Sequence, residues 1–308
     1  MNRRSFLKNS LTAGISMAGW FAGCSIRPIG HLYKISLAEW SLNQSLFSGI
    51  VQHLDFPAIA KREFGINAVE YVNQFFMDKA EDKSYLAEMK NRCDDLAVES
   101  VLIMCDNEGR IGDPDAMIRK QSVENHYKWI TAAQFLGCHS VRVNANSEGT
   151  PEEQQKLVAD GLYQLAEFGD DHNISVLVEN HGGNSSNGKW LVGLLKRVHH
   201  ARVGTLPDFG NFRISDNEFY DRYLGVEELL PFARGVSAKS SEFSQAGIEV
   251  RTDFLRMMRI VVKSGYRGHV GIEYSGKPLS EKDGIAATKK LLDHIHQQLL
   301  SEYQLFNG

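Results

Sequence analysis

Short apolar runs alternate with amphipathic segments along most of the chain. The apolar runs are rich in β-branched residues and recur roughly every 30 to 40 residues, which is typical of buried strands separated by helices. The pattern predicts strands at residues 34–39, 68–72, 100–104, 140–144, 174–179, 203–208, 235–239 and 270–274.

The amphipathic segments between these runs have the spacing of helices that bury one face. They predict helices at residues 57–64, 83–96, 116–136, 152–168, 189–199, 226–233, 254–263 and 285–302. Gly65, Gly137 and Gly265 follow three of them, where a left-handed residue ends a helix. Asp78 and Thr150 are the predicted starts of two others, the latter with a proline at the first helical position.

Repeated strand–helix units indicate an α/β fold with a parallel sheet. Eight such units in about 275 residues match a single-domain (β/α)₈ TIM barrel. An open doubly wound sheet also alternates, but it normally has a glycine-rich turn after its first strand. The residues there are Glu39-Trp40-Ser41-Leu42, so we predict the barrel, over residues 25–308.

The first 24 residues have the pattern of an export signal. The twin-arginine motif Arg3-Arg4-Ser5-Phe6-Leu7-Lys8 precedes an uncharged apolar stretch, residues 11–23, that is too short to span a bilayer. Phe21-Ala22-Gly23-Cys24 resembles a lipobox, which would leave Cys24 as a lipidated N-terminus; plain signal cleavage nearby is the alternative. We therefore predict an exported protein, periplasmic or anchored to the cell envelope through lipid at Cys24.

Composition and charge exclude several classes of protein. The 308 residues have 34 Lys and Arg, 38 Asp and Glu and only 7 Pro, an ordinary globular composition. Loss of residues 1–23, which contain three basic residues and no acid, would change the net charge from −4 to −7. Such a charge argues against a nucleic-acid partner. The four cysteines form no C-x-x-C pair, so we expect buried free thiols at Cys93, Cys105 and Cys138.

Acidic residues gather at the predicted strand ends, which form the active-site rim of a barrel. The last residues of the strands include Glu39, Glu70, Asp106, Asn144, Glu179, Asp208, Lys239 and Glu273. So many carboxylates in one partly desolvated mouth repel one another, and a divalent cation is the simplest compensation. Some of these acids could instead cap helices or pair with Arg and Lys; Glu179, Asp208 and Glu273 are the strongest candidates for a metal or substrate site.

Alternation along the strands indicates which other side chains face the mouth. His181 shares a face with Glu179, and Ser237 shares one with Lys239. Lys239 is either an ion-pair partner of the acids or an acid/base group. Arg142 and Asn144 share the inner face of their strand, where Arg142 is expected to neutralise a glutamate. Trp40 follows the first strand, where it would either stack on a sugar or pack a lid.

Three motifs together resemble the xylose-isomerase-like TIM-barrel superfamily, which contains sugar isomerases and epimerases, inosose dehydratases and family-2 AP endonucleases. The resemblance covers essentially the whole chain after the signal and is greatest to exported Bacteroidetes-type proteins of the sugar phosphate isomerase/epimerase group. The motifs are Val178-Glu179-Asn180-His181-Gly182-Gly183, Leu206-Pro207-Asp208-Phe209-Gly210-Asn211 and Val236-Ser237-Ala238-Lys239, followed by Gly271-Ile272-Glu273-Tyr274.

The resemblance implies one divalent metal ion, Mn²⁺, Zn²⁺ or Mg²⁺, held by Glu179, Asp208 and Glu273. The family's strand-seven histidine falls on Ser237, the Asp after its Lys falls on Ser240, and a histidine after the strand-six Asp falls on Asn211. His181, Ser237 or water would complete the metal sphere, or Lys239 would replace the ion.

The resemblance also implies proton abstraction beside a carbonyl, with Glu179 and Glu273 as the acid/base pair and Lys239 as a third catalytic candidate. Glu70, Asn144, His181, Asn211, Trp40 and Arg142 are the predicted substrate-binding residues. The expected partner is a small carbohydrate, and the expected activity is that of a sugar isomerase or epimerase. Two alternatives stay open: a lyase or hydratase acting on 3-keto-sugars or 3-keto-glycosides, and a carbohydrate-binding lipoprotein without activity.

Overall fold

The computed structural model describes residues 31–307, with side chains up to residue 302. The predicted export signal and lipidation site at Cys24 lie outside the described residues. None of the described helices is long and apolar enough to cross a membrane.

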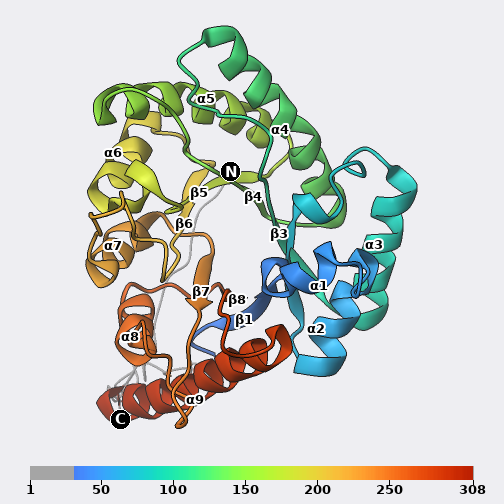
Figure 1. Cartoon of the computed structure of the whole chain (residues 1–308), viewed down its shortest axis with the longest axis vertical. Helices are drawn as coiled ribbons and strands as arrows, with labels where there is room; N and C mark the ends of the chain where they lie inside the picture. Colours follow the sequence, from blue (N-terminus) through green and yellow to red (C-terminus); the bar gives the residue numbers. More distant parts are fainter. Residues whose placement is uncertain (1–30, 308) are drawn as a thin grey trace, which may run out of the picture. The chain divides into compact units, whose positions relative to one another are not determined.

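The described chain forms a parallel eight-stranded barrel surrounded by helices (Figure 1). The hydrogen-bonded order is β6-β5-β4-β3-β2-β1-β8-β7. Bridges from Thr205 to Ala233 and from Asp208 to Ser237 join β6 to β7 and close the circle. The strands are β1 (Lys34–Ala38), β2 (Ala68–Val72), β3 (Glu99–Met104), β4 (Ser140–Val143), β5 (Ser175–Glu179), β6 (Val203–Leu206), β7 (Val236–Ser240) and β8 (His269–Tyr274).

The helices cover the outside of the barrel and mostly follow the predicted spans. They are α1 (Asn43–Phe47), α2 (Phe56–Phe64), α3 (Lys83–Leu96), α4 (Ala116–Leu136), α5 (Pro151–Asp171), α6 (Gly188–Val198), α7 (Arg222–Leu229), α8 (Phe254–Lys263) and α9 (Glu281–Asn307). The spans of α3, α4 and α8 are as predicted, whereas α9 begins earlier and ends later than its apolar pattern. The prediction of a TIM barrel is confirmed.

Helix starts depend on which side chain reaches the free backbone N–H groups. Thr150 and Glu153 form a complete capping box at the start of α5, as the sequence indicates. The prediction that Asp78 begins a helix is wrong: Asp78 pairs with Lys79 at 3.0 Å, and Asp82 caps α3 by accepting from the backbone N–H of Tyr85.

Two separate cores follow from the alternation of side chains along the strands. The larger core lies between the strands and the helices and includes Trp129, Phe56 and Met257. The smaller one fills part of the barrel interior with Ala38, Ala68, Val72, Val101, Leu102, Met104, Leu177 and Leu206. The remaining inward positions of β4 to β8 are largely polar, and Ser36 and Glu70 place a further polar pair inside β1 and β2.

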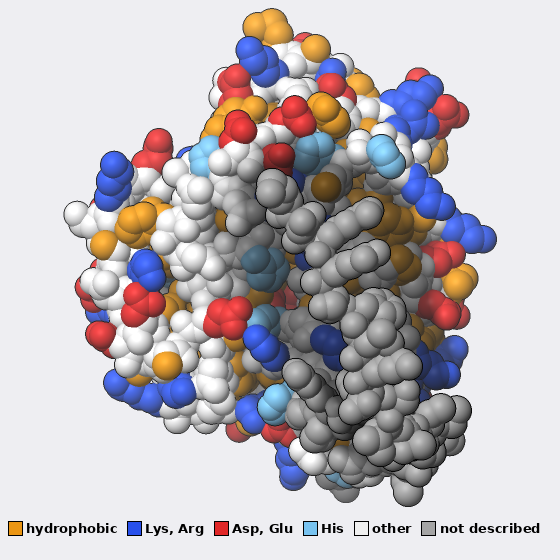
Figure 2. Space-filling model, turned by 180° about the vertical axis from the view of Figure 1, so that it is seen from behind, with side chains coloured by type: hydrophobic (Ala, Val, Ile, Leu, Met, Phe, Trp, Pro, Cys, Tyr) orange, Lys and Arg blue, Asp and Glu red, His pale blue; other side chains and the backbone are white. Residues whose placement is uncertain are grey.

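The described cysteines agree with the sequence-based expectation, and one face of the surface has mixed charge. Cys93, Cys105 and Cys138 are buried and free, as predicted. The face shown in Figure 2, outside the grey region, has Lys and Arg interspersed with Asp and Glu rather than gathered in one basic patch.

Candidate active site

A polar cavity of about 480 Å³ opens at the carboxyl end of the strands. Its lining includes Glu179, Glu273, Lys239, Asp106, Asn144 and His126. Trp40, Arg142 and His181 also line it. The strand-end position and the convergent polar groups are those of a barrel active site.

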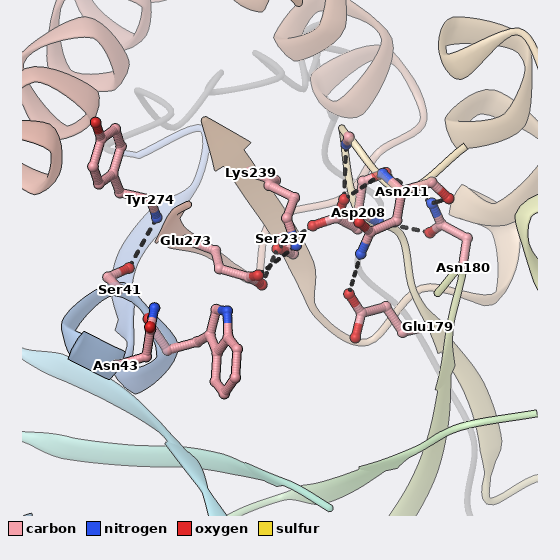
Figure 3. A network of polar contacts seen from close by, with 12 residues as sticks. Ser41, Asn43, Glu179, Asn180, Asp208, Asn211, Ser237, Lys239, Glu273 and Tyr274 are labelled. Atoms are coloured by element: carbon pink, nitrogen blue, oxygen red, sulfur yellow. Dashed lines mark hydrogen bonds and ion pairs between the residues drawn. The ribbon is translucent and has the colours of Figure 1, made fainter. Parts of the chain in front are cut away.

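Three buried carboxylates lie close together, and two of them, Glu179 and Glu273, line this cavity. Glu179 ends β5, Asp208 follows β6, and Glu273 lies on β8; one oxygen of each lies within 4.8 Å of the others. Each of the three residues is at most 5% exposed. Figure 3 shows the three carboxylates directed toward a common centre. This group, called the acidic cluster below, is the set that the sequence selects for metal binding.

Neutral donors hold each member of the acidic cluster in place. Asp208 Oδ1 accepts from the backbone N–H groups of Gly210 and Asn211 at 2.7 and 2.8 Å. Ser237 Oγ lies 2.7 Å from Asp208 Oδ2 and 3.1 Å from Glu273 Oε2, between the two carboxylates (Figure 3). Asn211 Nδ2 donates to Glu179 Oε1 at 2.9 Å. Ser237 and Asn211, at the two positions where the resemblance implies histidines, thus serve as hydrogen-bond donors to the cluster.

Two cations partly compensate the negative charge. Lys239 Nζ donates to Glu273 Oε1 at 2.6 Å. Arg142 is buried between Glu179 and Asp106, with Nε 2.9 Å from Glu179 Oε2 and Nη1 2.7 Å from Asp106 Oδ1. The expectations that Arg142 neutralises a glutamate and that Lys239 pairs with an acid agree with these contacts.

Burial and pairing act in opposite directions on the acidic cluster. Burial raises the pKa of Glu179 and of Asp208 to about 7, although Arg142 and Lys239 respectively oppose the shift. Burial also favours the neutral form of Glu273, but Lys239 outweighs it, and the pKa of Glu273 is lowered. Without a further cation, the cluster therefore tends to retain protons at Glu179 and Asp208.

The acidic cluster fits a hard divalent cation. All three converging atoms are carboxylate oxygens, the ligands that Mg²⁺ and Mn²⁺ prefer. Glu179 Oε2 is buried without a hydrogen bond, because its contact with Arg142 Nε is not aligned. When all four carboxylates, counting Asp106, are ionised, their described ion pairs with Arg142 and Lys239 leave two negative charges uncompensated. His181 lines the cavity but is not part of the cluster found among the described residues.

Three other strand-end acids do not join this cluster. Glu39 accepts from the backbone N–H of Val72 at 2.9 Å and faces His53, outside the cavity lining. Glu70 lies inside the barrel, where Ser36 Oγ donates to it at 2.5 Å, and it does not line the cavity either. Asp106 lines the cavity but is occupied by Arg142, Asn144 and Gln74. The alternative that some of the strand-end acids pair with other groups instead of joining one centre therefore applies to these three.

The other predicted substrate-binding residues are spread over the mouth. Trp40, Arg142, Asn144 and His181 line the cavity, whereas Asn211 lies behind Glu179 as its hydrogen-bond donor and Glu70 is enclosed in the barrel. The sequence analysis did not select Gln74, Asn146 or His126, which line the cavity too. His126 gives no signal because a histidine within a long amphipathic helix resembles an ordinary core residue.

Residues 58–297 match the model of the xylose isomerase-like TIM barrel family. The chain belongs to this family. The match includes the acidic cluster with Lys239 and Arg142. No curated protein matches the chain in sequence.

Solved structures with the same fold include a D-tagatose 3-epimerase-like protein, at 18% identity and a TM-score of 0.67, covering 88% of this chain and 99% of that one. A probable 3-DHS dehydratase of Bacillus anthracis has 16% identity and a TM-score of 0.62, with coverage of 84% and 98%. A xylose isomerase-like TIM barrel protein of Mycobacterium smegmatis in complex with magnesium has 15% identity and a TM-score of 0.63, with coverage of 87% and 97%. At these identities the likeness establishes the fold.

Proposed function

We propose that this protein is a divalent-metal-dependent sugar isomerase or epimerase that removes a proton beside a carbonyl group. The single observation that supports this function best is the acidic cluster, three buried carboxylates at the mouth of a barrel of this family. The epimerase-like solved structure with the same fold is consistent with it.

Glu179 and Glu273 are the proposed acid/base pair. They belong to β5 and β8 and both line the cavity, so a sugar bound there has a carboxylate on either side. One carboxylate would accept the proton from carbon and the other would return one, which is how a positioned pair catalyses enolisation. Lys239 and Arg142 would hold these carboxylates in place through their ion pairs.

Glu179, Asp208 and Glu273 would hold the metal ion, and the all-oxygen set favours Mg²⁺ or Mn²⁺ over Zn²⁺. When bound, such an ion would polarise the substrate carbonyl and stabilise negative charge on its oxygen. The metal content of the purified protein, measured beside its Glu179→Gln variant, tests this assignment. About one equivalent in the wild type and a loss in the variant would support it; no metal in either protein, even after soaking, would contradict it.

Activity is tested with a panel of ketoses and 3-keto-glycosides in D₂O, with products followed by NMR and mass spectrometry. An isomerase or epimerase gives a product of the same composition, with deuterium at the carbon beside the carbonyl. The Glu273→Gln variant should form this product about 10³-fold more slowly. Glu302→Gln, in an exposed pair with Arg259, serves as the matched control. An active Glu273→Gln variant would overturn the proposal.

A lyase or hydratase acting on keto-sugars is the second candidate, because the same abstraction can lead to elimination. The structural likeness to a probable dehydratase is consistent with it. The same experiment separates the two, since elimination or hydration changes the mass of the product. Carbohydrate binding without any deuterium exchange would instead support the non-catalytic lipoprotein.

We also propose export and lipid attachment at Cys24, from the sequence of residues 1–24. Labelling with a fatty-acid analogue, followed by cell fractionation, tests both. A Cys24→Ser variant should lose the label and leave the membrane fraction. An unlabelled wild type found in the cytoplasm would contradict the proposal.

A further inference from the structure

The mouth cavity has a second wall besides the acidic cluster. It is formed by residues 106–110, which follow β3, together with Asn146 after β4 and His126 from α4. Neither Asn146 nor His126 has a part in the proposed proton transfer. We call residues 107–110, His126 and Asn146 the distal wall.

The distal wall is held rigidly. Glu108 Oε1 accepts from Trp129 Nε1 at 2.6 Å and forms an ion pair with Lys128 Nζ at 3.0 Å, and the backbone carbonyl of Glu108 accepts from Asn125. Gly109 has a φ of +94°, and a Cβ there would collide with Ser122 Oγ of α4. The segment therefore packs directly on the helix that carries His126, which makes a preformed surface rather than a loose loop.

His126 presents an unused acceptor to the cavity. Its side chain is only 3% exposed, and Nδ1 lies 2.7 Å from the carbonyl oxygen of Ser122. Because a carbonyl can only accept, Nδ1 carries the proton, and burial lowers the pKa of the ring so that it is neutral. Nε2 is then an acceptor, and residues 31–302 provide it with no hydrogen-bond partner. A ligand hydroxyl is the group that matches it.

The charges of the distal wall are already paired. Arg110 lies 2.8 Å from Asp113 and also contacts Glu148, and Lys128 pairs with Glu108. The remaining polar groups are the uncharged side chains of Asn107, Asn146 and His126. Such a wall suits hydroxyl groups rather than a phosphate, which would need free cations.

We propose that the distal wall binds a second, uncharged polyhydroxylated unit linked to the reacting sugar, so that the substrate is a glycoside rather than a free monosaccharide or a sugar phosphate. This inference rests on the proposed function for the position of the reacting unit. The reacting sugar lies at the acidic cluster, and a hydroxyl of the attached unit donates to His126 Nε2.

The test compares a 3-keto-disaccharide with the 3-keto-monosaccharide that it contains. Wild-type kcat/KM should be higher for the disaccharide. His126→Ala and Asn146→Ala should each lower it by about 3- to 10-fold for the disaccharide, the effect of one lost hydrogen bond, without changing it for the monosaccharide. Asn146 is exposed, so its variant is not expected to affect folding. His172→Ala is the matched control, because His172 makes the same contact with the carbonyl of Phe168 but does not line the cavity.

The proposal for the distal wall would be contradicted by equal kcat/KM for both sugars in the wild type, or by a disaccharide preference that both variants retain. Either result would leave the proposed function unaffected. If the wild type converts neither sugar, the proposed function fails instead. Calorimetric affinities for an unreactive disaccharide and its monosaccharide then test the wall by itself. If the wild type binds the disaccharide more tightly and His126→Ala does not, the proposed role of the distal wall is supported. If the wild type binds both sugars equally well, that role is contradicted.

Discussion

The acids of β1 to β3 and those of β5, β6 and β8 stand at equivalent places in the barrel and have different surroundings. Glu39, Glu70 and Asp106 are each held in a separate local network. Glu179, Asp208 and Glu273 instead converge, with oxygens within 4.8 Å of one another. The difference shows that position at a strand end does not by itself make an acid part of the site.

Layering inside the barrel explains part of the difference. Glu70 lies beside Ser36 and opposite Gly271, where any side chain would collide with its carboxylate. Glu273 is two residues beyond Gly271, so it lies one layer nearer the mouth. Glu273 therefore reaches the cavity, while Glu70 remains enclosed.

The largest expected difference between the two groups is in catalysis. Glu273→Gln keeps the shape of the side chain but removes the proton acceptor, so we expect turnover to fall by about 10³-fold. Circular dichroism should show an intact fold. Glu302→Gln, at an exposed ion pair, should retain full activity. A Glu273→Gln variant within tenfold of the wild type would remove the distinction between the groups.

Asp106 is expected to matter more for stability than the other paired acids. Asp106→Asn leaves the buried Arg142 with only Glu179 as an anionic partner, so the free energy of unfolding should fall by about 3 kcal/mol. Chemical denaturation measures the loss. Asp94→Asn, at the exposed pair with Lys90, should change it by less than about 0.5 kcal/mol. Equal losses in the two variants would mean that the ion pair between Asp106 and the buried Arg142 contributes no more to stability than an exposed pair.

The barrel and the acidic cluster were accessible from the sequence because both depend on local patterns. Alternation fixed which residues of each strand face inward, and the carboxyl ends of parallel strands meet at one mouth. Glu179, Asp208, Glu273 and Lys239 were found in this way. The partners of Glu39 were not, since His53 approaches it only through the packing of the segment before α2.

Contacts between distant segments could not be predicted for the same reason. His126 reaches the cavity because Gly109 allows residues 106–110 to pack on α4, and no periodicity in the sequence signals that contact. Ser237 and Asn211 were noted as departures from the family pattern, but their role as donors to the carboxylates required the three-dimensional arrangement.

Glu70 should give stability a pH dependence that its glutamine variant lacks. Burial raises its pKa from 4.5 to about 7 in the folded protein. Between these values the unfolded chain releases the proton while the folded protein keeps it, so the stability present below pH 4.5 is lost as the pH rises toward 7. The Glu70→Gln variant has no such group and does not show this loss. The difference in free energy of unfolding, variant minus wild type, should therefore be about 2 to 3 kcal/mol larger above pH 7 than at pH 4.5. Parallel denaturation curves for both proteins at pH 4.5 and 7.5 measure it, and a constant difference would contradict the buried, protonated carboxyl.

Ser237 and Ser240 offer the finest test, because both are buried on β7 and face opposite sides of the strand. Ser237 Oγ contacts Asp208 and Glu273, whereas Ser240 Oγ contacts Thr288. Each serine-to-alanine change should lower the free energy of unfolding of the metal-free protein by about 1 kcal/mol, through one lost hydrogen bond. Mn²⁺ should restore the lost stability in Ser237→Ala but not in Ser240→Ala. The reason is that a cation between Asp208 and Glu273 offsets the repulsion between these carboxylates, which the Ser237 hydroxyl reduces when no metal is bound. Thermal unfolding with and without Mn²⁺ measures this, and an equal metal-induced rise in Tm for wild type and both variants would show that Ser237 has no special relation to the ion.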